Sequence, residues 1–239
     1  MSLIAEGRVL VSGREATKPA TGVEAGTPVL VRTDPDQPHW VSRGAHKLLG
    51  ALGAFPVEVA GRRVLDAGAS TGGFTEVLLS RGAREVVAVD VGYGELAWSL
   101  RTDDRVAVHE RTNVRDLRPE TIGGPVDLVV ADLSFISLRL VLPALIACAT
   151  PDADVLPMVK PQFEVGRDRL GAGGVVRDPA LRAEAVLAVA RAAADQGWGT
   201  AGMVASPLPG PAGNVEFFLW LRRGAPAPEP ADVDRAVQE

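Results

Sequence analysis

The sequence lacks the features of disulfide-bonded, membrane-spanning and secreted proteins. It has 239 residues but one cysteine, Cys148, so no disulfide can form within the chain. The apolar run around Cys148 predicts a buried thiol rather than a nucleophile. No apolar stretch approaches the roughly 20 residues that span a membrane, and no signal peptide is evident. We therefore expect a cytoplasmic protein whose partners include neither a membrane nor a metal ion.

Lysine is also scarce, since only Lys18, Lys47 and Lys160 stand beside 22 arginines. Arginine does not deprotonate in proteins, whereas lysine serves in amine chemistry, so these lysines are candidates for a reactive role. Chance remains an alternative with three residues. The net charge of −5 is not that of a typical nucleic-acid binder, although residues 1–63 carry a local charge of +2 and the tail is acidic.

A glycine-rich turn stands out at residues 64–75, VLDAGASTGGFT, between a predicted strand ending at Asp66 and a predicted helix. A dinucleotide fingerprint needs glycine where Ser70 stands, and a phosphate-binding loop needs lysine where Phe74 stands. S-adenosylmethionine (SAM) has no phosphate, and its ammonium tolerates a carboxylate such as Asp66. The turn thus favours a SAM site, with a ligand-free turn as the alternative.

Strands and helices alternate from Arg62 onward, which predicts a doubly wound α/β fold with a mainly parallel sheet. Ligands of such sheets bind at the carboxyl ends of the strands. Asp90 ends the second strand, where a carboxylate can accept both ribose hydroxyls, and Asp116 lies where the third loop meets an adenine. Asp132 and Lys160 end the fourth and fifth strands. Glu216 lies inside the last strand, either buried or on a solvent face.

The remaining segments are shorter. Residues 1–32 predict a compact β-rich module, 33–41 a linker, and 225–239 a disordered acidic tail. A helix from Ser42 would carry Arg43, His46 and Lys47 on one cationic stripe, with a solvated helix start as the alternative. The loop Pro161–Arg177 suits a lid that orders on RNA, and an ordinary mobile loop is the alternative.

Five motifs carry a resemblance to a known family: VLDAGASTGGFT, ADLSFISL, MVKPQFEVGR, GAGGVVRDP and NVEFF. From about Ile4 to Arg223 the chain resembles the TlyA family, FtsJ-like ribose 2′-O-methyltransferases of ribosomal RNA that are also called hemolysins. The resemblance implies a Rossmann-like SAM methyltransferase domain at 42–224 whose last strand is antiparallel. It also implies that residues 1–32 are the second half of an S-four-type RNA-binding module. The helical first half has no counterpart here, which predicts weakened RNA affinity.

The resemblance further implies residue roles. The catalytic tetrad falls on Lys47, Asp132, Lys160 and Glu216. The residues expected to bind SAM are Asp66, Gly68, Ala69, Ser70, Thr71, Gly72, Gly73, Phe74, Asp90, Val91, Asp116 and Asp132. The residues expected to bind RNA are Arg8, Arg14, Lys18, Arg43, His46, Arg167 and Arg169.

The implied reaction methylates a cytidine ribose in 16S or 23S ribosomal RNA within assembled subunits. A 2′-hydroxyl is a weak acid, so the enzyme must align it with the methyl group and assist the loss of one proton. Lys160 is the candidate that takes or steers this proton, positioned by Asp132 and Glu216. Two alternatives remain open: a SAM enzyme acting on a small hydroxylated metabolite, and a non-catalytic RNA-binding or ribosome-assembly factor. A pore-forming hemolysin is disfavoured because no amphipathic segment of membrane length is present.

Overall fold

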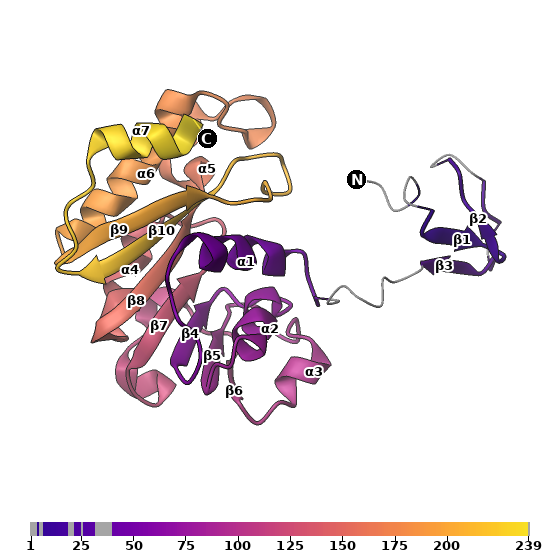
Figure 1. Cartoon of the computed structure of the whole chain (residues 1–239), viewed down its shortest axis with the longest axis horizontal. Coiled ribbons are helices and arrows are strands. Elements are labelled where there is room, and N and C mark those ends of the chain that lie inside the picture. Colours follow the sequence, from indigo (N-terminus) through magenta and orange to yellow (C-terminus); the bar gives the residue numbers. More distant parts are fainter. Residues whose placement is uncertain (1–3, 5–6, 19–21, 25, 32–39, 239) are drawn as a thin grey trace. The chain divides into compact units, whose positions relative to one another are not determined.

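The computed structural model describes residues 4, 7–18, 22–24, 26–31 and 40–238, which form two compact units divided between residues 39 and 40 (Figure 1). The predicted linker residues 33–39 lie outside the described residues. Trp40 and Val41 belong to the larger unit, where the Val41 amide donates to Glu76 Oε2 at 2.7 Å. The larger unit therefore begins two residues before the predicted boundary at 42.

The smaller unit contains an antiparallel sheet of order β2-β1-β3, from β1 (Val9–Val11), β2 (Arg14–Glu15) and β3 (Val29–Val31). Ser12 and Gly13 connect β1 to β2 with φ of 49° and 79°. Two consecutive positive φ angles are what a two-residue hairpin turn requires. The predicted β-rich runs are confirmed, while the RNA-binding identity of the unit stays a prediction.

The larger unit is built on a seven-stranded sheet of order β6-β5-β4-β7-β8-β10-β9. Its strands are β4 (Arg63–Ala67), β5 (Glu85–Val89), β6 (Val106–His109), β7 (Val126–Ala131), β8 (Ala149–Val159), β9 (Trp198–Ala205) and β10 (Phe217–Arg223). β10 runs antiparallel to both β8 and β9, while β4 to β8 pair in parallel. The expected doubly wound sheet with an antiparallel last strand is confirmed.

Helices cover both faces of this sheet. The helices are α1 (Gly44–Ala54), α2 (Gly73–Ser80), α3 (Trp98–Arg101), α4 (Leu138–Ala147), α5 (Pro161–Glu164), α6 (Pro179–Ala194) and α7 (Pro230–Gln238). Short 3₁₀ turns lie at η1 (Val114–Asp116), η2 (Pro119–Ile122), η3 (Arg167–Arg169) and η4 (Ala172–Gly174). Residues of α1, α2 and α3 form one core cluster with the sheet, and residues of α4, α6 and α7 form another. In Figure 1, α1 lies across the near face of the sheet.

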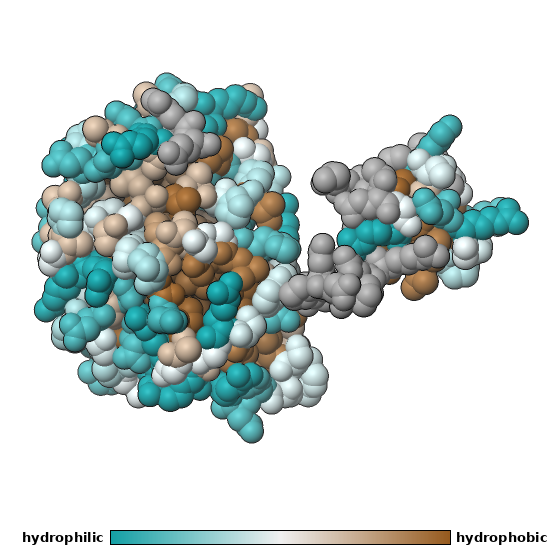
Figure 2. Space-filling view, in the orientation of Figure 1, coloured by the Kyte–Doolittle hydropathy of each residue, from teal (hydrophilic) through white to brown (hydrophobic). Residues whose placement is uncertain are grey.

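The distribution of hydrophilic and hydrophobic residues on the surface agrees with this arrangement of helices over a sheet. Hydrophilic residues cover much of the face viewed in Figure 2, and hydrophobic residues gather around α1. Within α1 itself, Leu48 and Leu52 are buried against the sheet, as their spacing predicts. Within the described residues, no helix is long and apolar enough to cross a membrane.

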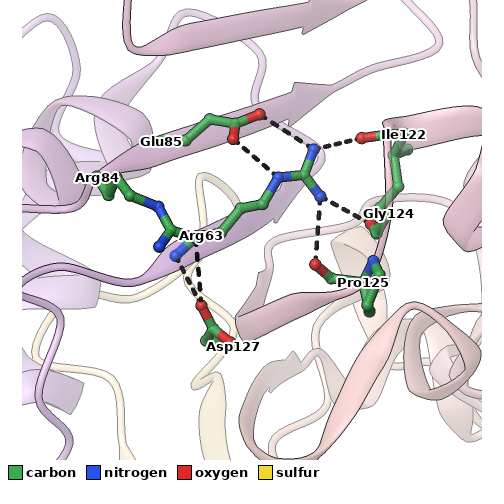
Figure 3. A network of polar contacts seen from close by, with 7 residues as sticks. All are labelled: Arg63, Arg84, Glu85, Ile122, Gly124, Pro125 and Asp127. Atoms are coloured by element: carbon green, nitrogen blue, oxygen red, sulfur yellow. Dashed lines mark hydrogen bonds and ion pairs between the residues drawn. The ribbon is translucent and has the colours of Figure 1, made fainter.

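Arg63 links the amino ends of β4, β5 and β7 (Figure 3). Its guanidinium donates to both carboxylate oxygens of Glu85, at 2.9 and 3.0 Å, which joins β4 to β5. It also donates to the carbonyl oxygen of Gly124 at 2.7 Å and to that of Ile122, at the start of β7. Charge-assisted bonds to a bidentate carboxylate are among the stronger polar contacts in proteins. The sheet is thus fastened at the end opposite to the strands' carboxyl ends.

The prediction of a disordered tail is wrong for the described residues. Pro230–Gln238 forms α7, which packs against α6 and β9. Val233 is 1% exposed and Val237 is buried, four residues apart on one face of the helix. Two valines in a segment rich in Pro, Ala and acids hardly change its average composition, which is why composition alone missed a packed helix.

Candidate active site

A cavity of about 480 Å³ opens at the carboxyl ends of β4, β5 and β7. It is lined by Gly68, Ser70, Asp90, Val91, Glu95, Asn113, Val114, Asp132, Leu133, Ser134, Phe135, Ile136 and Val141. A second cavity of about 190 Å³ shares three of these residues and adds the start of α1. Its lining is Ser42, Arg43, Gly44, Gly68, Ala69, Ser70, Thr71, Gly73, Phe74 and Asp132. The larger volume falls within the range typical of small-molecule and cofactor sites.

The charge of the larger cavity favours a cationic ligand. Three carboxylates, Asp90, Glu95 and Asp132, line it, and its lining contains no lysine, arginine or histidine. Lys160 pairs with Asp132, but a phosphate group would still meet the carboxylates of Asp90 and Glu95, whereas an ammonium or sulfonium would be attracted. Within the described residues, no group of three or more His, Cys, Asp or Glu is placed to hold a metal ion. The residues present therefore fit SAM, as its two cationic groups require.

Asp90 is held in place by the backbone on both sides. Its Oδ2 accepts from the amide of Ser70 at 2.8 Å, and its Oδ1 accepts from the amide of Gly92 at 2.7 Å. A carboxylate oxygen can accept a second hydrogen bond. Asp90 thus lines the cavity at the end of β5 in a fixed orientation, and its contact with ribose hydroxyls stays a prediction.

The glycines of the turn permit close packing of backbone. Gly68 has φ of 88°, and a Cβ there would lie 2.5 Å from the carbonyl oxygen of Asp132. A Cβ on Gly73 would overlap Ser42 Oγ and the amide of Ala45, and one on Gly72 would overlap Leu100. The sequence attributed these glycines to ligand approach. The structure adds that β7, α1 and α3 approach the turn too closely for any side chain.

Asp66 lies beneath the site rather than in it. It is 0% exposed and lines neither cavity, and its Oδ2 accepts from the Thr75 hydroxyl at 2.7 Å. Its Oδ1 has no hydrogen-bond partner among the described residues. Burial, opposed by the Thr75 hydrogen bond and supported by nearby Asp132 and Asp90, raises the pKa of Asp66 to about 7. Direct contact with a ligand, which the sequence suggested, has no support in this arrangement.

Asp116 is also displaced from its predicted place. It is exposed in η1 and lines neither cavity, whereas Asn113 and Val114 line the larger one. Asn113 caps this turn by accepting from the amide of Arg115 at 3.0 Å. Asp116 is the only carboxylate of the NVRD stretch, which is why it was predicted, but Asn113 and Val114 at the start of the turn line the cavity instead.

The four predicted catalytic residues form two ion pairs. Lys160 Nζ lies 2.6 Å from Asp132 Oδ1 in an ion pair without the direction of a good hydrogen bond, and it donates to Ser134 Oγ at 2.9 Å. Lys47 Nζ lies 2.5 Å from Glu216 Oε2, with side chains 6% and 1% exposed. Phe217 pairs with Val159 in the sheet, so continuing this register by one residue brings Glu216 opposite Lys160.

Two predicted details of this set need correction. Lys47 is buried, whereas Arg43 and His46 are exposed, so the expected cationic stripe on α1 is split. Glu216 precedes β10 instead of lying inside it, and its burial excludes the solvent-face alternative.

An aromatic pair beside Lys160 was not predicted from the sequence. Phe135 is 92% exposed with φ of 63°, and its ring centroid lies 5.3 Å from that of Phe163. Positive φ is strained for a bulky residue and often marks a functional turn. Phe135 stands three residues after Asp132 in the ADLSF motif, which was the available signal.

The predicted RNA-binding residues occupy different settings. Arg14 and Lys18 are exposed in the smaller unit, where Arg8 is half-buried. Arg167 is exposed in η3. Arg169 donates to both carboxylate oxygens of Glu184 at 2.7 Å and to the carbonyl oxygen of Val165 at 2.8 Å.

The loop after Lys160 is more ordered than its composition indicates. It contains α5, η3 and η4, and Asn214 fastens it by accepting from Val176 N at 2.9 Å and donating to Gly174 O at 3.1 Å. Its action as a lid over RNA stays a prediction.

Comparison with known proteins identifies the family. The model of the FtsJ-like methyltransferase family matches residues 40–223, which is most of the chain. The chain belongs to the FtsJ-like methyltransferase family. The matched residues begin at Trp40, where the larger unit begins, and they include all four residues of the two ion pairs.

Individual relatives agree with this family. The chain is 68% identical over 220 residues to the 16S/23S rRNA (cytidine-2′-O)-methyltransferase TlyA of Mycobacterium tuberculosis, covering 92% of this chain and 82% of the relative. A solved structure described as a hemolysin from Streptococcus thermophilus superposes with a TM-score of 0.83 at 37% identity, covering 98% of this chain and 86% of that one. A methyltransferase from Burkholderia thailandensis with bound S-adenosylhomocysteine shares the fold, with a TM-score of 0.51 at 19% identity over 77% of this chain and 78% of that one.

Proposed function

We propose that the protein transfers a methyl group from SAM to the 2′-hydroxyl of a cytidine in ribosomal RNA of assembled subunits. The observation that carries this proposal is the position of Lys160, which pairs with Asp132 where Asp132 lines a cavity suited to a cationic cofactor. The naming of the 68% identical relative as a cytidine-2′-O-methyltransferase of 16S and 23S rRNA supports the substrate. Ribosomal subunits as acceptors would place the reaction in the cytoplasm.

The cofactor-binding part is proposed first. Asp90 would accept from the ribose hydroxyls of SAM, and the lining around Asn113, Val114 and Ile136 would enclose its adenine. The carboxylates would attract its cationic end, since opposite charges attract most strongly where water is excluded. When bound, SAM supplies a methyl group that its sulfonium has already activated. We expect Asp90→Ala to weaken SAM binding roughly tenfold or more in calorimetry, because a hydrogen bond to a charged group contributes about 1.5–3 kcal/mol.

The protein must then prepare the acceptor hydroxyl. Lys160 is held by Asp132 and Ser134, so its ammonium group has a fixed position at the rim of the cavity. In this position the ammonium would donate a hydrogen bond to the 2′-oxygen and orient it. Only the neutral amine, formed after the ammonium has lost one proton, could take the departing proton. Phe135, exposed beside it, offers a face on which an unstacked base could lie. The exposed Arg43, His46 and Arg167 would contact phosphates.

The experiment combines purified protein, tritium-labelled SAM and isolated 30S or 50S subunits that lack the modification. We expect label in ribosomal RNA that nucleoside analysis identifies as 2′-O-methylcytidine. Lys160→Ala and Lys160→Arg should each lower turnover roughly 100-fold or more, since acid–base groups contribute about 10²–10⁴-fold, with SAM affinity retained. Near-normal turnover in both variants would show that Lys160 does not have this role.

The other readings predict different results from the same mixture. Label only in small molecules would indicate a metabolite methyltransferase. Binding to subunits without transfer of label would indicate an assembly factor. Leakage of liposomes caused by the pure protein would be required of a pore-forming hemolysin.

A further inference from the structure

Two segments that follow neighbouring strands are joined along their whole length. Residues 132–139 follow β7, and residues 160–164 follow β8. Lys160 contacts Asp132 and Ser134 at one end, and the ring of Phe163 packs at a tilt against that of Phe135 in the middle. Glu164 makes a further contact at the far end of this joint between residues 132–139 and 160–164.

Glu164 is buried against the beginning of α4. Its side chain is 1% exposed, its Oε1 accepts from the amide of Leu138 at 2.6 Å, and its Oε2 accepts from the Ser137 hydroxyl at 2.6 Å. Arg139 Nε adds an ion pair with Oε2 at 3.3 Å. A carboxylate is favourable at the N-terminus of a ten-residue helix. Burial raises the pKa of the Glu164 carboxyl, and the hydrogen bonds from these donors offset part of that increase.

The turn that carries Glu164 needs such an anchor. α5 has four residues, and one isolated turn of helix is not stable by itself. The turn includes the backbone of Lys160, because Phe163 N donates to Lys160 O at 2.9 Å. Any displacement of the turn would therefore move both Lys160 and Phe163.

We infer that Glu164 is a positioning residue, which sets Lys160 against Asp132 and holds the Phe135–Phe163 pair by fastening α5 to the start of α4. Its part in catalysis rests on the function proposed above. Glu164 itself lies away from the cofactor site, because the residues that it contacts, Ser137, Leu138 and Arg139, line neither cavity. Asp132, Ser134 and Phe135 do line the larger cavity, so loosening the joint should lower the rate of methyl transfer more than it lowers SAM affinity.

The test variant is Glu164→Gln, which keeps the size of the side chain and one acceptor oxygen. It replaces the other oxygen with an NH₂ group that cannot accept from Ser137 or Arg139. We expect kcat for methyl transfer to fall roughly 10- to 100-fold, because misplacing reacting groups by about 1 Å can have that effect. The SAM dissociation constant from calorimetry should rise by a smaller factor than kcat falls, and Glu164→Ala should lower kcat further.

The matched control is Glu184→Gln on α6. Glu184 also pairs with an arginine, since both of its carboxylate oxygens accept from Arg169 Nη1, but its side chain is 54% exposed. An exposed pair contributes about 0–1 kcal/mol, so kcat should be unchanged. Hydrogen exchange of the free protein gives a readout without substrate. Glu164→Gln should speed exchange at 132–139 and 160–165 and leave 68–74 unchanged, whereas Glu184→Gln should change exchange in none of these segments.

The outcomes separate the two proposals. Unchanged exchange at 132–139 in Glu164→Gln, or a loss of kcat matched by an equal loss of SAM affinity, would overturn the positioning role. Absence of methyl transfer to rRNA by the unaltered protein, together with the expected exchange pattern, would overturn the proposed function and leave the anchoring by Glu164 supported.

Discussion

Lys47 of α1 and Glu216, 169 residues apart in the chain, form a buried ion pair that ties the first helix of the larger unit to the start of its last strand. Burying two charges is costly unless they satisfy each other. A buried ion pair is often no more stabilising than apolar residues of similar size. We therefore expect this pair, which lies beside Lys160, to serve the reaction as well as the fold.

We expect Lys47→Met to lower the free energy of unfolding by about 3–5 kcal/mol, because it leaves the Glu216 carboxylate buried without a partner. The double variant Lys47→Met/Glu216→Met should regain most of this loss in urea unfolding, since no buried charge remains. Its methyl transfer should nevertheless stay low. A double variant with normal turnover would show that the pair serves only the fold.

Asp66 should make stability depend on pH. Its pKa of about 7 in the folded protein exceeds the ordinary 3.8, so between these values the folded state binds more protons and stability falls as pH rises. The full effect is on the order of 4 kcal/mol. The difference in unfolding free energy between Asp66→Asn and the unaltered protein should therefore shift in favour of the variant from pH 4 to 7. Parallel curves would contradict the raised pKa.

Gly68→Ala and Gly94→Ala test close packing at the turn. Both positions have positive φ, 88° and 75°, and share that strain, but only a Cβ at 68 would meet backbone, the carbonyl of Asp132. We expect Gly94→Ala to lose about 1–2 kcal/mol of stability and to keep SAM affinity. Gly68→Ala should lose at least as much stability and also bind SAM several-fold more weakly, because Asp132 must move. Equal SAM affinities in the two variants would argue against this coupling.

Arg63 should contribute to the stability of the fold and not to the reaction. Arg63→Ala leaves the carbonyls of Ile122 and Gly124 without this donor, and we expect a loss of about 3 kcal/mol. For a domain of this size, thermal denaturation should then shift down by roughly 6–12 °C. Arg84→Ala is the control, because Arg84 lies 3.9 Å from Asp127 in an exposed pair and should shift the midpoint little. A similar shift in both variants would show that the network is not what holds this end of the sheet.

The sequence predicted best what the sheet itself determines. Alternating strands and helices place strand ends at one edge, and Asp90, Asp132 and Lys160 lie there for that reason. Local turns were less predictable: η1 presents Asn113 and Val114 to the cavity and leaves Asp116 exposed. Helical spacing alone could not show that Lys47 turns inward, because Glu216 lies in a distant part of the sequence.

Contacts within loops were also beyond sequence reasoning. Arginine in a glycine-rich loop indicated phosphate binding, but Arg169 pairs with Glu184 on a helix whose packing depends on the whole fold. The role of Glu164 was equally unpredictable, because its contact with the start of α4 joins residues that are distant in the sequence.

The end of the chain has a consequence for handling this protein. β9 is one of the two edge strands of its sheet, and the segment leading to α7 lies along it, with the Pro226 carbonyl accepting from the amide of Thr200 at 2.9 Å. An outermost strand without cover is a template for pairing with another molecule. Shortening the protein after Gly224 would remove this cover, so shortened versions should be examined by light scattering for self-association before any loss of activity is attributed to chemistry.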